Sequence, residues 1–263
     1  MYCLVWRAVP SARLFNSRRP GGRRSARSCN HQGFAGRLRS IGLISSDGDK
    51  AALLQKAAQT ATGQLPEAFF EAAGSIQSDG DRGRVLATVI SRDGEEPVSL
   101  TRALRVASML SSDGEKARAL IAAARGFHGL PETLAAAGRV LGSMQSDGDR
   151  RRSLEALLDA DGRNAATQRE LLLQTATINS DDDKARVLIK VAASFDERES
   201  VRRAFFSAVN TMHSSADQKR VLLAVLTRGG LQADTLREVT YSASQISSES
   251  DQSAVLKALS GRP

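Results

Sequence analysis

The hexapeptide QSDGDR occurs at residues 77–82 and again at residues 145–150. Its two aspartates, separated by a glycine, are the residue types that bind calcium in loop sites. An EF-hand loop also needs glycine at loop position 6 and a bidentate glutamate at position 12. Here the glycine falls at position 2, and four aligned copies place aliphatic residues at position 12: Ile90, Ala124, Leu158 and Ala192. The motif therefore does not predict a calcium site.

Few other residues have the types and spacing that catalysis or metal binding requires. The histidines are His31, His128 and His213, and none has a partner at ligand or triad spacing. Both cysteines, Cys3 and Cys29, lie near the amino terminus, and HExxH, GxSxG and GxxxxGK[ST] motifs are absent. We therefore expect no enzyme activity, no cofactor and no metal site.

A repeat of 34 residues organises most of the chain. Taking each aligned serine as position 0, position +3 is always acidic, position +8 is always leucine, and position −2 is always a large aliphatic residue. The first spacing between serines is 32 residues and the other five are 34. The aligned serines are Ser46, Ser78, Ser112, Ser146, Ser180, Ser214 and Ser248. A fixed period of this length indicates a solenoid of stacked structural units.

Each unit is predicted to contain two helices, which we call helix A and helix B. In helix A, apolar or small residues recur at positions +7, +8, +11 and +12, which share one face of an α-helix. A connector rich in turn residues follows, and helix B carries its own apolar stripe. The segment PETLAAAGRVLGSM (131–144), with proline in its first turn, and residues 199–212 exemplify helix B.

These features predict an all-α, right-handed αα-solenoid of about six units over residues 34–263, with a superhelix like those of tetratricopeptide and HEAT repeats. The units start at residues 46, 78, 112, 146, 180 and 214, and a capping helix follows residue 248, at about 249–260. Residues 31–44 are expected to form a helix B-like cap before the first unit. We expect the two residues missing from that unit to be lost from its connector.

The serine and the acidic residue at position +3 together have helix-capping chemistry. A serine oxygen accepts a hydrogen bond from a first-turn N–H group, and the acidic side chain can reach back to the serine N–H. Each such N-cap contributes about 1 kcal/mol. We therefore expect the seven serines to be structural N-caps.

Two ladders of basic residues are candidates for a partner-binding ridge. The ladder at position +4 is Lys50, Arg82, Lys116, Arg150 and Lys184, and the ladder at position +6 is Arg84, Arg118, Arg152, Arg186 and Arg220. On stacked helices each ladder would form a basic ridge suited to an acidic peptide or a phosphate backbone. Every arginine at position +6 also follows an acidic residue by three positions, which favours a row of neutralising ion pairs instead.

The basic charge of the chain is confined to its amino terminus. Residues 1–46 hold nine arginines and no acidic residue, whereas the rest holds 28 basic and 29 acidic residues. Residues 1–33 have the Arg-, Gly- and Ser-rich composition of a disordered extension. A transit peptide, an arm that contacts nucleic acid, and a solvated or non-native start all remain open for this extension.

The segments SDGDKAALLQKAA (46–58), SDGEKARALIAAA (112–124) and SDDDKARVLIKVA (180–192) resemble a bacterial tandem helical repeat of the form SDxxKxxVLxxxA. That repeat occurs after the protease domain of membrane metallopeptidases of the β-lactam-sensor type, and in proteins built largely of such units. The resemblance covers about residues 46–263 and implies a helical interaction module. It implies no protease activity here, because the HExxH motif and any long apolar run are missing.

The sequence thus favours a non-enzymatic scaffold whose concave face binds an extended peptide or a partner helix. The alternative is a nucleic-acid or organelle RNA-associated repeat factor that uses the arginine ladder and the basic extension. The near-neutral repeat region makes nucleic acid the weaker expectation. We expect a monomer without a membrane span, soluble and cytoplasmic, or in an organelle if the extension is a transit peptide.

Overall fold

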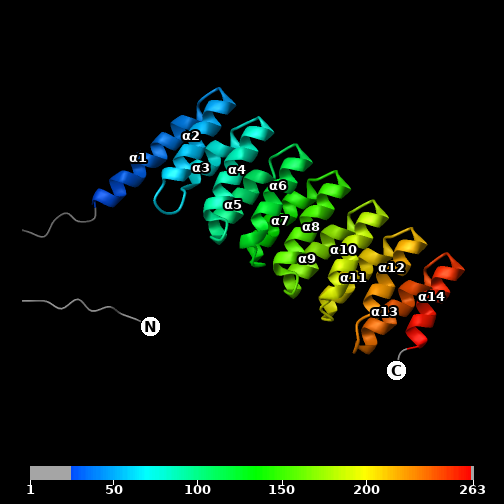
Figure 1. Ribbon diagram of the computed structural model, residues 1–263. Helices are drawn as coiled ribbons and strands as arrows, with labels where there is room; N and C mark the ends of the chain where they lie inside the picture. The colour runs from blue at the N-terminus through cyan, green and yellow to red at the C-terminus, as the bar shows by residue number, and fades with distance from the viewer. Residues whose placement is uncertain (1–24, 262–263) are drawn as a thin grey trace, which may run out of the picture.

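The computed structural model describes residues 25–261, with the side chains of residues 33–261. Over residues 25–261 the chain forms fourteen α-helices and one short 3₁₀-helix, η1 (Ala124–Gly126), with no strand. Each helix packs against its neighbour in sequence and against its counterpart in the adjoining unit, so the units stack in a row (Figure 1). The predicted all-α array of stacked helix pairs is confirmed.

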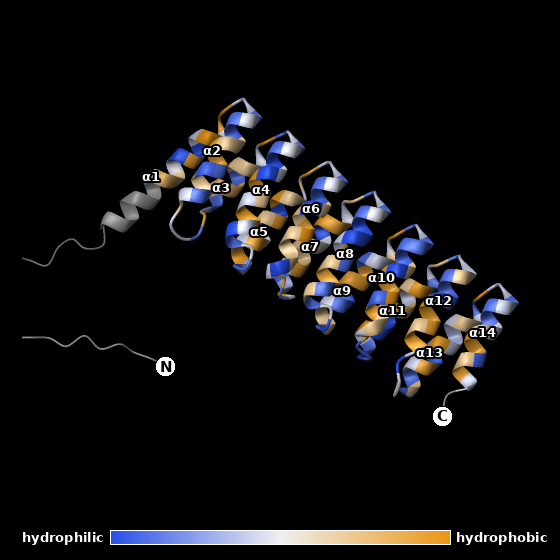
Figure 2. Ribbon diagram, in the orientation of Figure 1, coloured by the Kyte–Doolittle hydropathy of each residue, from blue (hydrophilic) through white to orange (hydrophobic). Residues whose placement is uncertain are grey.

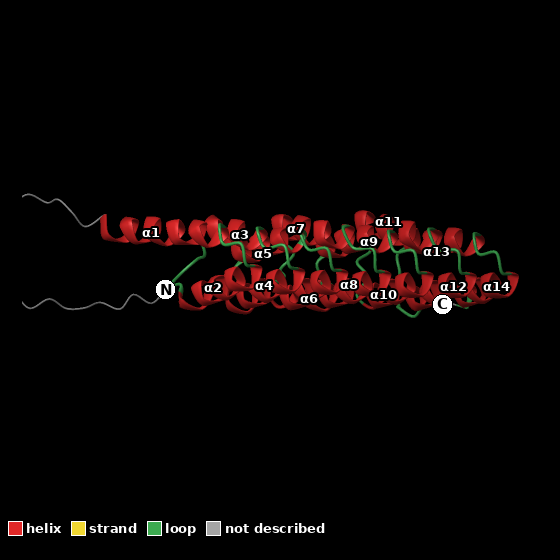
Figure 3. Ribbon diagram, turned by 90° about the horizontal axis from the view of Figure 1, so that it is seen from above, coloured by secondary structure: helices red, strands yellow, loops and turns green. Residues whose placement is uncertain are grey.

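The helices lie in two layers (Figure 3). The A layer holds the first helix of every unit, and each of these begins directly after an aligned serine: α2 (Asp47–Thr60), α4 (Asp79–Asp93), α6 (Asp113–Ala123), α8 (Asp147–Asp161), α10 (Asp181–Ala193), α12 (Ser215–Leu226) and α14 (Glu249–Ser260). The B layer holds α1 (Ser25–Gly42), α3 (Glu67–Gly74), α5 (Pro97–Ala107), α7 (Pro131–Gly142), α9 (Ala165–Ala176), α11 (Glu199–Asn210) and α13 (Ala233–Ser244).

One hydrophobic core runs between the two layers along the whole array, and hydrophobic segments recur in every unit (Figure 2). Helix A contributes positions +7, +8, +11 and +12, and helix B contributes its own stripe. In the fifth unit the buried residues of these two sets are Val187, Leu188, Val191, Ala192, Phe205, Val209 and Met212. Each fully buried aliphatic or aromatic side chain of this kind stabilises the fold by about 1.5–3 kcal/mol.

The first helix begins earlier than the composition indicates. Residues 25–33 belong to α1, although their composition predicts that they are part of the disordered extension. The last helix-breaking cluster, PGG at residues 20–22, precedes Ser25, and the residues after it are compatible with a helix. Phe34, Leu38 and Ile41 attach this helix to the core, and the helix continues back from them. The remainder of the extension, including Cys3, lies outside the described residues.

The short first unit is also built differently from the prediction. Helix B of that unit, α3, has only eight residues, whereas the other B-layer helices from α5 to α13 have eleven or twelve. The loss therefore falls on the first turn of helix B and not on the connector. Pro66 precedes α3 and disfavours helical geometry at the residue before it, while Gly63 turns the chain with a φ of 94°.

Candidate partner-binding surface

All seven aligned serines are the N-caps of A-layer helices. Each serine Oγ accepts a hydrogen bond from the backbone N–H at position +3, as in the 3.2 Å bond from Asp149 to Ser146. The other caps are Ser46, Ser78, Ser112, Ser180, Ser214 and Ser248, with distances of 3.3–3.4 Å. The capping carboxylates do not converge, and among the described residues no group of three or more His, Cys, Asp or Glu could hold a metal ion.

The aspartate at position +1 links each unit to the next. Asp113 Oδ2 accepts hydrogen bonds from the backbone N–H groups of Gln145 and Ser146, both at 2.7 Å. We call this arrangement the inter-repeat clamp. Asp47, Asp79, Asp147 and Asp181 form the same clamp at four other joints. At the sixth joint Ser215 Oγ accepts from the N–H of Ser248 at 3.3 Å.

The clamp corrects the expected capping box. The serine N–H was expected to bond to the acidic side chain at position +3 of its own helix. In five units it bonds instead to the position +1 aspartate of the preceding unit. The position +1 side chain projects from the helix start toward the next joint, where two N–H groups need an acceptor.

The clamp also perturbs the acidity of its carboxylates. Hydrogen bonds from the N–H groups of Ser78, the larger contribution, and Gln77 lower the pKa of Asp47 below its usual value. Burial acts to raise the pKa of Asp113, but its two N–H donors and Lys116 outweigh that effect and lower it. Both carboxylates are therefore held in the charged form.

The ladder at position +4 is not a ridge. Lys50, Arg82, Lys116, Arg150 and Lys184 are buried, with only 3–6% of each residue exposed. Their charged groups hydrogen-bond to the turn that joins helix B to the next helix A. Arg150, for example, donates to the carbonyl of Thr177 at 2.9 Å and to that of Met144. These carbonyls at the helix B end would otherwise lack a partner, which explains why a long donor recurs at this position.

The ladder at position +6 is exposed and paired with acidic residues. Arg84, Arg118 and Arg152 form ion pairs with the acids three residues before them, and Arg220 Nη1 lies 2.6 Å from Asp217 Oδ1. Arg186 differs, since its Nε lies 2.8 Å from Asp182 Oδ2. Hydrogen bonds from Arg220 and Arg186 lower the pKa of Asp182. The column therefore carries alternating charges, and its outer ends remain accessible to a partner.

A groove crosses the outward face of the A layer over α4. Three adjoining hollows between α2, α4 and α6 share Ala87 as a lining residue, and the largest has a volume of about 1040 Å³. We call the combined hollow the α4 groove. Its characteristic lining residues are Gly83, Ala87, Ser91, Ile121, Ala122 and Arg125.

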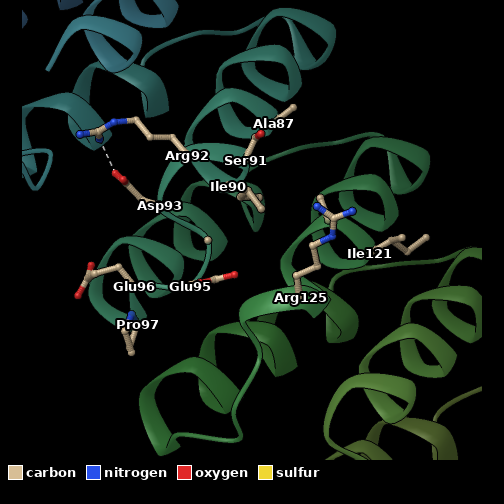
Figure 4. Close-up of a pocket in the computed structure, with 12 residues that line it drawn as sticks. Ala87, Ile90, Ser91, Arg92, Asp93, Glu95, Glu96, Pro97, Ile121 and Arg125 are labelled. Carbon is tan, nitrogen blue, oxygen red and sulfur yellow. Dashed lines mark hydrogen bonds and ion pairs between the residues drawn. The ribbon is translucent and has the colours of Figure 1, made fainter.

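Small side chains on α4 create the groove. Gly83, Ala87 and Ser91 recur at four-residue spacing and so share one helix face. The larger Ile121, which is 43% exposed, borders them from α6. Figure 4 shows the largest hollow, with Glu95 and Arg125 on opposite sides of it.

The groove contains two of the predicted ridge residues and several that the sequence analysis did not select. Arg84 and Arg118 line it, whereas Arg152, Arg186 and Arg220 are not among its lining residues. Ala87, Ile121 and Arg125 were missed because they occupy positions +9 and +13, which carry no repeated residue type. The change of residue type at position +9 along the array is the sequence signal that could have located the groove. Position +9 reads Gln55, Ala87, Ile121, Glu155, Ile189, Leu223 and Lys257 along the array.

The described histidines have no part in this surface. His128 is exposed in a connector, and the His213 ring Nδ1 lies 3.2 Å from the carbonyl oxygen of Thr211. The side chains of His31 and Cys29 lie outside the described part of the chain. None of the helices described is long and apolar enough to cross a membrane.

Comparison with known proteins assigns no family to this chain. No protein-family model matches it, and neither a curated protein nor a solved structure does.

Proposed function

We propose that this chain is a non-enzymatic helical-repeat scaffold that binds an extended peptide or a partner helix in the α4 groove. The sequence predicts that the partner binds a concave face, and we propose that this face is the outward face of the A layer. The observation that carries the proposal is the division of labour between positions. The serine and the leucine that recur in every unit make caps and core, and the residues that recur in five units at positions +1 and +4 make clamps and turn contacts. The outward positions +9 and +13 instead differ from unit to unit.

The same division supports the resemblance to the SDxxKxxVLxxxA repeat as part of the proposal. The serine is the cap, the following aspartate is the clamp, the basic residue is the buried turn donor, and the apolar residues form the core. A motif made of structural residues leaves function to the residues between them. Solenoids commonly bind their partners through such variable outward positions.

The lining of the α4 groove indicates the chemistry of the partner. Ala87, Ala122 and Ile121 offer a shallow apolar floor, suited to small or aliphatic side chains of a partner. The guanidinium of Arg125 is exposed at the border and makes no ion pair among the described residues, so a partner carboxylate can bind it. We therefore favour a short apolar segment with an acidic residue beside it.

Selection of peptides from a displayed random library tests this proposal. Selected peptides should bind the full chain, and Ala87→Trp, which fills the groove, should weaken them by about tenfold or more. Ala135→Trp is the matched control, because Ala135 is an exposed alanine on α7 in the B layer. Failure to select any peptide, or equal binding by the two variants, would contradict the proposal.

The RNA-associated alternative rests on the five exposed arginines at position +6. Their ion pairs with acidic residues weaken it, because a phosphate backbone binds best to uncompensated cations. Retention of the chain on single-stranded polyuridylate should be negligible even at low salt. Strong retention that falls steeply as salt rises would instead favour the alternative. Turnover in a broad hydrolase screen would remove the non-enzymatic part of the proposal.

A further inference from the structure

At the carboxyl-terminal end of the array, the leucine at position +8 is exposed, although it is buried in all the other units. The leucine at position +8 is 0–1% exposed in all six preceding units: Leu54, Leu86, Leu120, Leu154, Leu188 and Leu222. Its counterpart in α14, Leu256, is 38% exposed. The difference arises because each of the other leucines is covered by the following unit, and no unit follows α14 in the described chain.

The amino-terminal end shows the complementary gap. Position +7 is at most 7% exposed where a unit precedes it, as in Val85, Ala119, Val187, Val221 and Val255. The corresponding residue of the first unit, Leu53 in α2, is 42% exposed. Position +7 therefore faces the preceding unit, and position +8 faces the following one. The two ends of the array expose opposite halves of the same joint.

The inter-repeat clamp is also divided between the two ends. At five of the six internal joints a carboxylate at position +1 accepts the N–H groups of the next serine and of the residue before it, as Asp113 does. At the amino-terminal end, the N–H groups of Ser45 and Ser46 have no acceptor among the described residues. At the other end Glu249 occupies position +1, and its carboxylate has no donor within the described chain. An acceptor is thus exposed at one end and its donors at the other.

The B layer provides a matching projection and hollow. Leu43, which follows α1, is 87% exposed and corresponds in the repeat to Met109. At an internal joint the Met109 sulfur lies against Gly74 of the preceding unit, 3.4 Å from where a glycine Cβ would stand. The residue that corresponds to Gly74 at the last unit is Ser244, which lines a hollow on α13 with Leu236 and Tyr241.

From these four observations we infer that the chain associates head to tail with a second copy of itself. The α13–α14 end of one copy covers the α1–α2 end of the next, with the contacts of an internal joint. Leu43 enters the hollow on α13, Leu53 and Leu256 are buried, and Glu249 accepts the N–H groups of Ser45 and Ser46. The sequence alone favours a monomer, because the exposure of residues at the two ends of the array is a property of the folded chain.

A contact of this kind is heterologous, so it does not close at a dimer. The expected wild-type behaviour is a mass that rises continuously with concentration, past twice the 28.1 kDa of one chain. The head-to-tail association is independent of the α4 groove, because Leu53, Leu256 and Glu249 do not line that groove.

Sedimentation equilibrium of the full chain and of two variants, up to about 1 mM, tests the inference. Leu53→Glu blocks the amino-terminal end and Leu256→Glu blocks the other, so each variant alone should remain monomeric. An equimolar mixture should form a heterodimer and nothing larger, because only one compatible pair of ends remains. Leu173→Glu is the control: Leu173 is 41% exposed in the middle of the B layer, and this variant should assemble like the wild type.

Three results would overturn the inference. They are a wild type that is monomeric throughout the concentration range, a wild type that stops at a closed dimer, and a mixture of the two variants that fails to dimerise. Far-UV circular dichroism of each variant establishes that it is folded. Both leucines are partly exposed, so a charged residue at either position should leave the fold intact.

Discussion

The inter-repeat clamp makes the sharpest prediction about stability, and Asp113→Ala tests it in the middle of the array. Asp113 Oδ2 receives two N–H groups at 2.7 Å, from Gln145 and Ser146. A hydrogen bond to a charged group contributes about 1.5–3 kcal/mol to stability, and partial exposure places this pair toward the lower end. We expect the substitution to lower the free energy of unfolding by about 2–4 kcal/mol, because both N–H groups lose their acceptor.

Urea denaturation followed by circular dichroism measures the total loss, and amide hydrogen exchange locates it. Exchange should accelerate most at Gln145 and Ser146, since opening of the joint no longer breaks the clamp. Asp113→Asn is the matched control, because its side-chain oxygen can still accept and should retain part of the stability. A loss below about 0.5 kcal/mol with unchanged exchange at the two amides would refute the clamp as a stabilising contact.

Further predictions concern the clamp, the buried basic residues, the caps and the exposed ion pairs. Because the folded-state pKa of Asp113 is lowered, the stability that its carboxylate contributes is fully present above the unfolded-state pKa of about 4. That stability is lost as pH falls through the lower folded-state pKa, so the melting temperature should fall there, and it should fall less for Asp113→Asn. Arg150→Met should cost about 2–4 kcal/mol in urea denaturation, because two turn carbonyls lose their donor. Lys184→Met should cost less than about 1 kcal/mol, since burial already lowers the pKa of Lys184 and so disfavours its charged form. Ser146→Ala should cost about 0.5–2 kcal/mol with no change in metal content, whereas Arg152→Ala, which breaks an exposed ion pair, should cost under about 1 kcal/mol.

The architecture was predictable because its determinants are local and repeated. A serine with an acidic residue three positions later marks a helix start where the apolar spacing of helix A follows it, and that spacing marks the buried face. These signals placed the start of every A-layer helix, from Asp47 in α2 to Glu249 in α14. The predicted start of the helical array was too late. Composition describes the preference of an isolated segment, whereas α1 is attached to the core through residues further along the chain.

The contacts between units were harder to predict, because the sequence does not show which groups meet across a joint. The aspartate at position +1 recurs in five units, as in Asp79 and Asp147, yet its partners lie 32 and 33 residues away. The basic residue at position +4 suggested a surface ridge, since lysine and arginine are usually exposed. It is buried because the turn above it supplies carbonyl acceptors that only the folded joint brings near.

The candidate surface was predictable only in part for a related reason. The arginines at position +6 were visible as a ladder, and two of them, Arg84 and Arg118, line the α4 groove. The groove itself depends on where the repeat is broken, through the small residues Gly83, Ala87 and Ser91. A search for repeated residues finds the cap, clamp and core positions, and it does not find positions at which the residue type varies.

The location of a bound peptide tests the proposed function most directly. Amide hydrogen exchange of the full chain can be compared with and without a peptide selected from the random library. We predict slower exchange in α4 and α6, at residues 79–93 and 113–123, with α5 and α7 unchanged. Slowing confined to the B-layer helices would contradict the proposal that the outward face of the A layer is the binding surface.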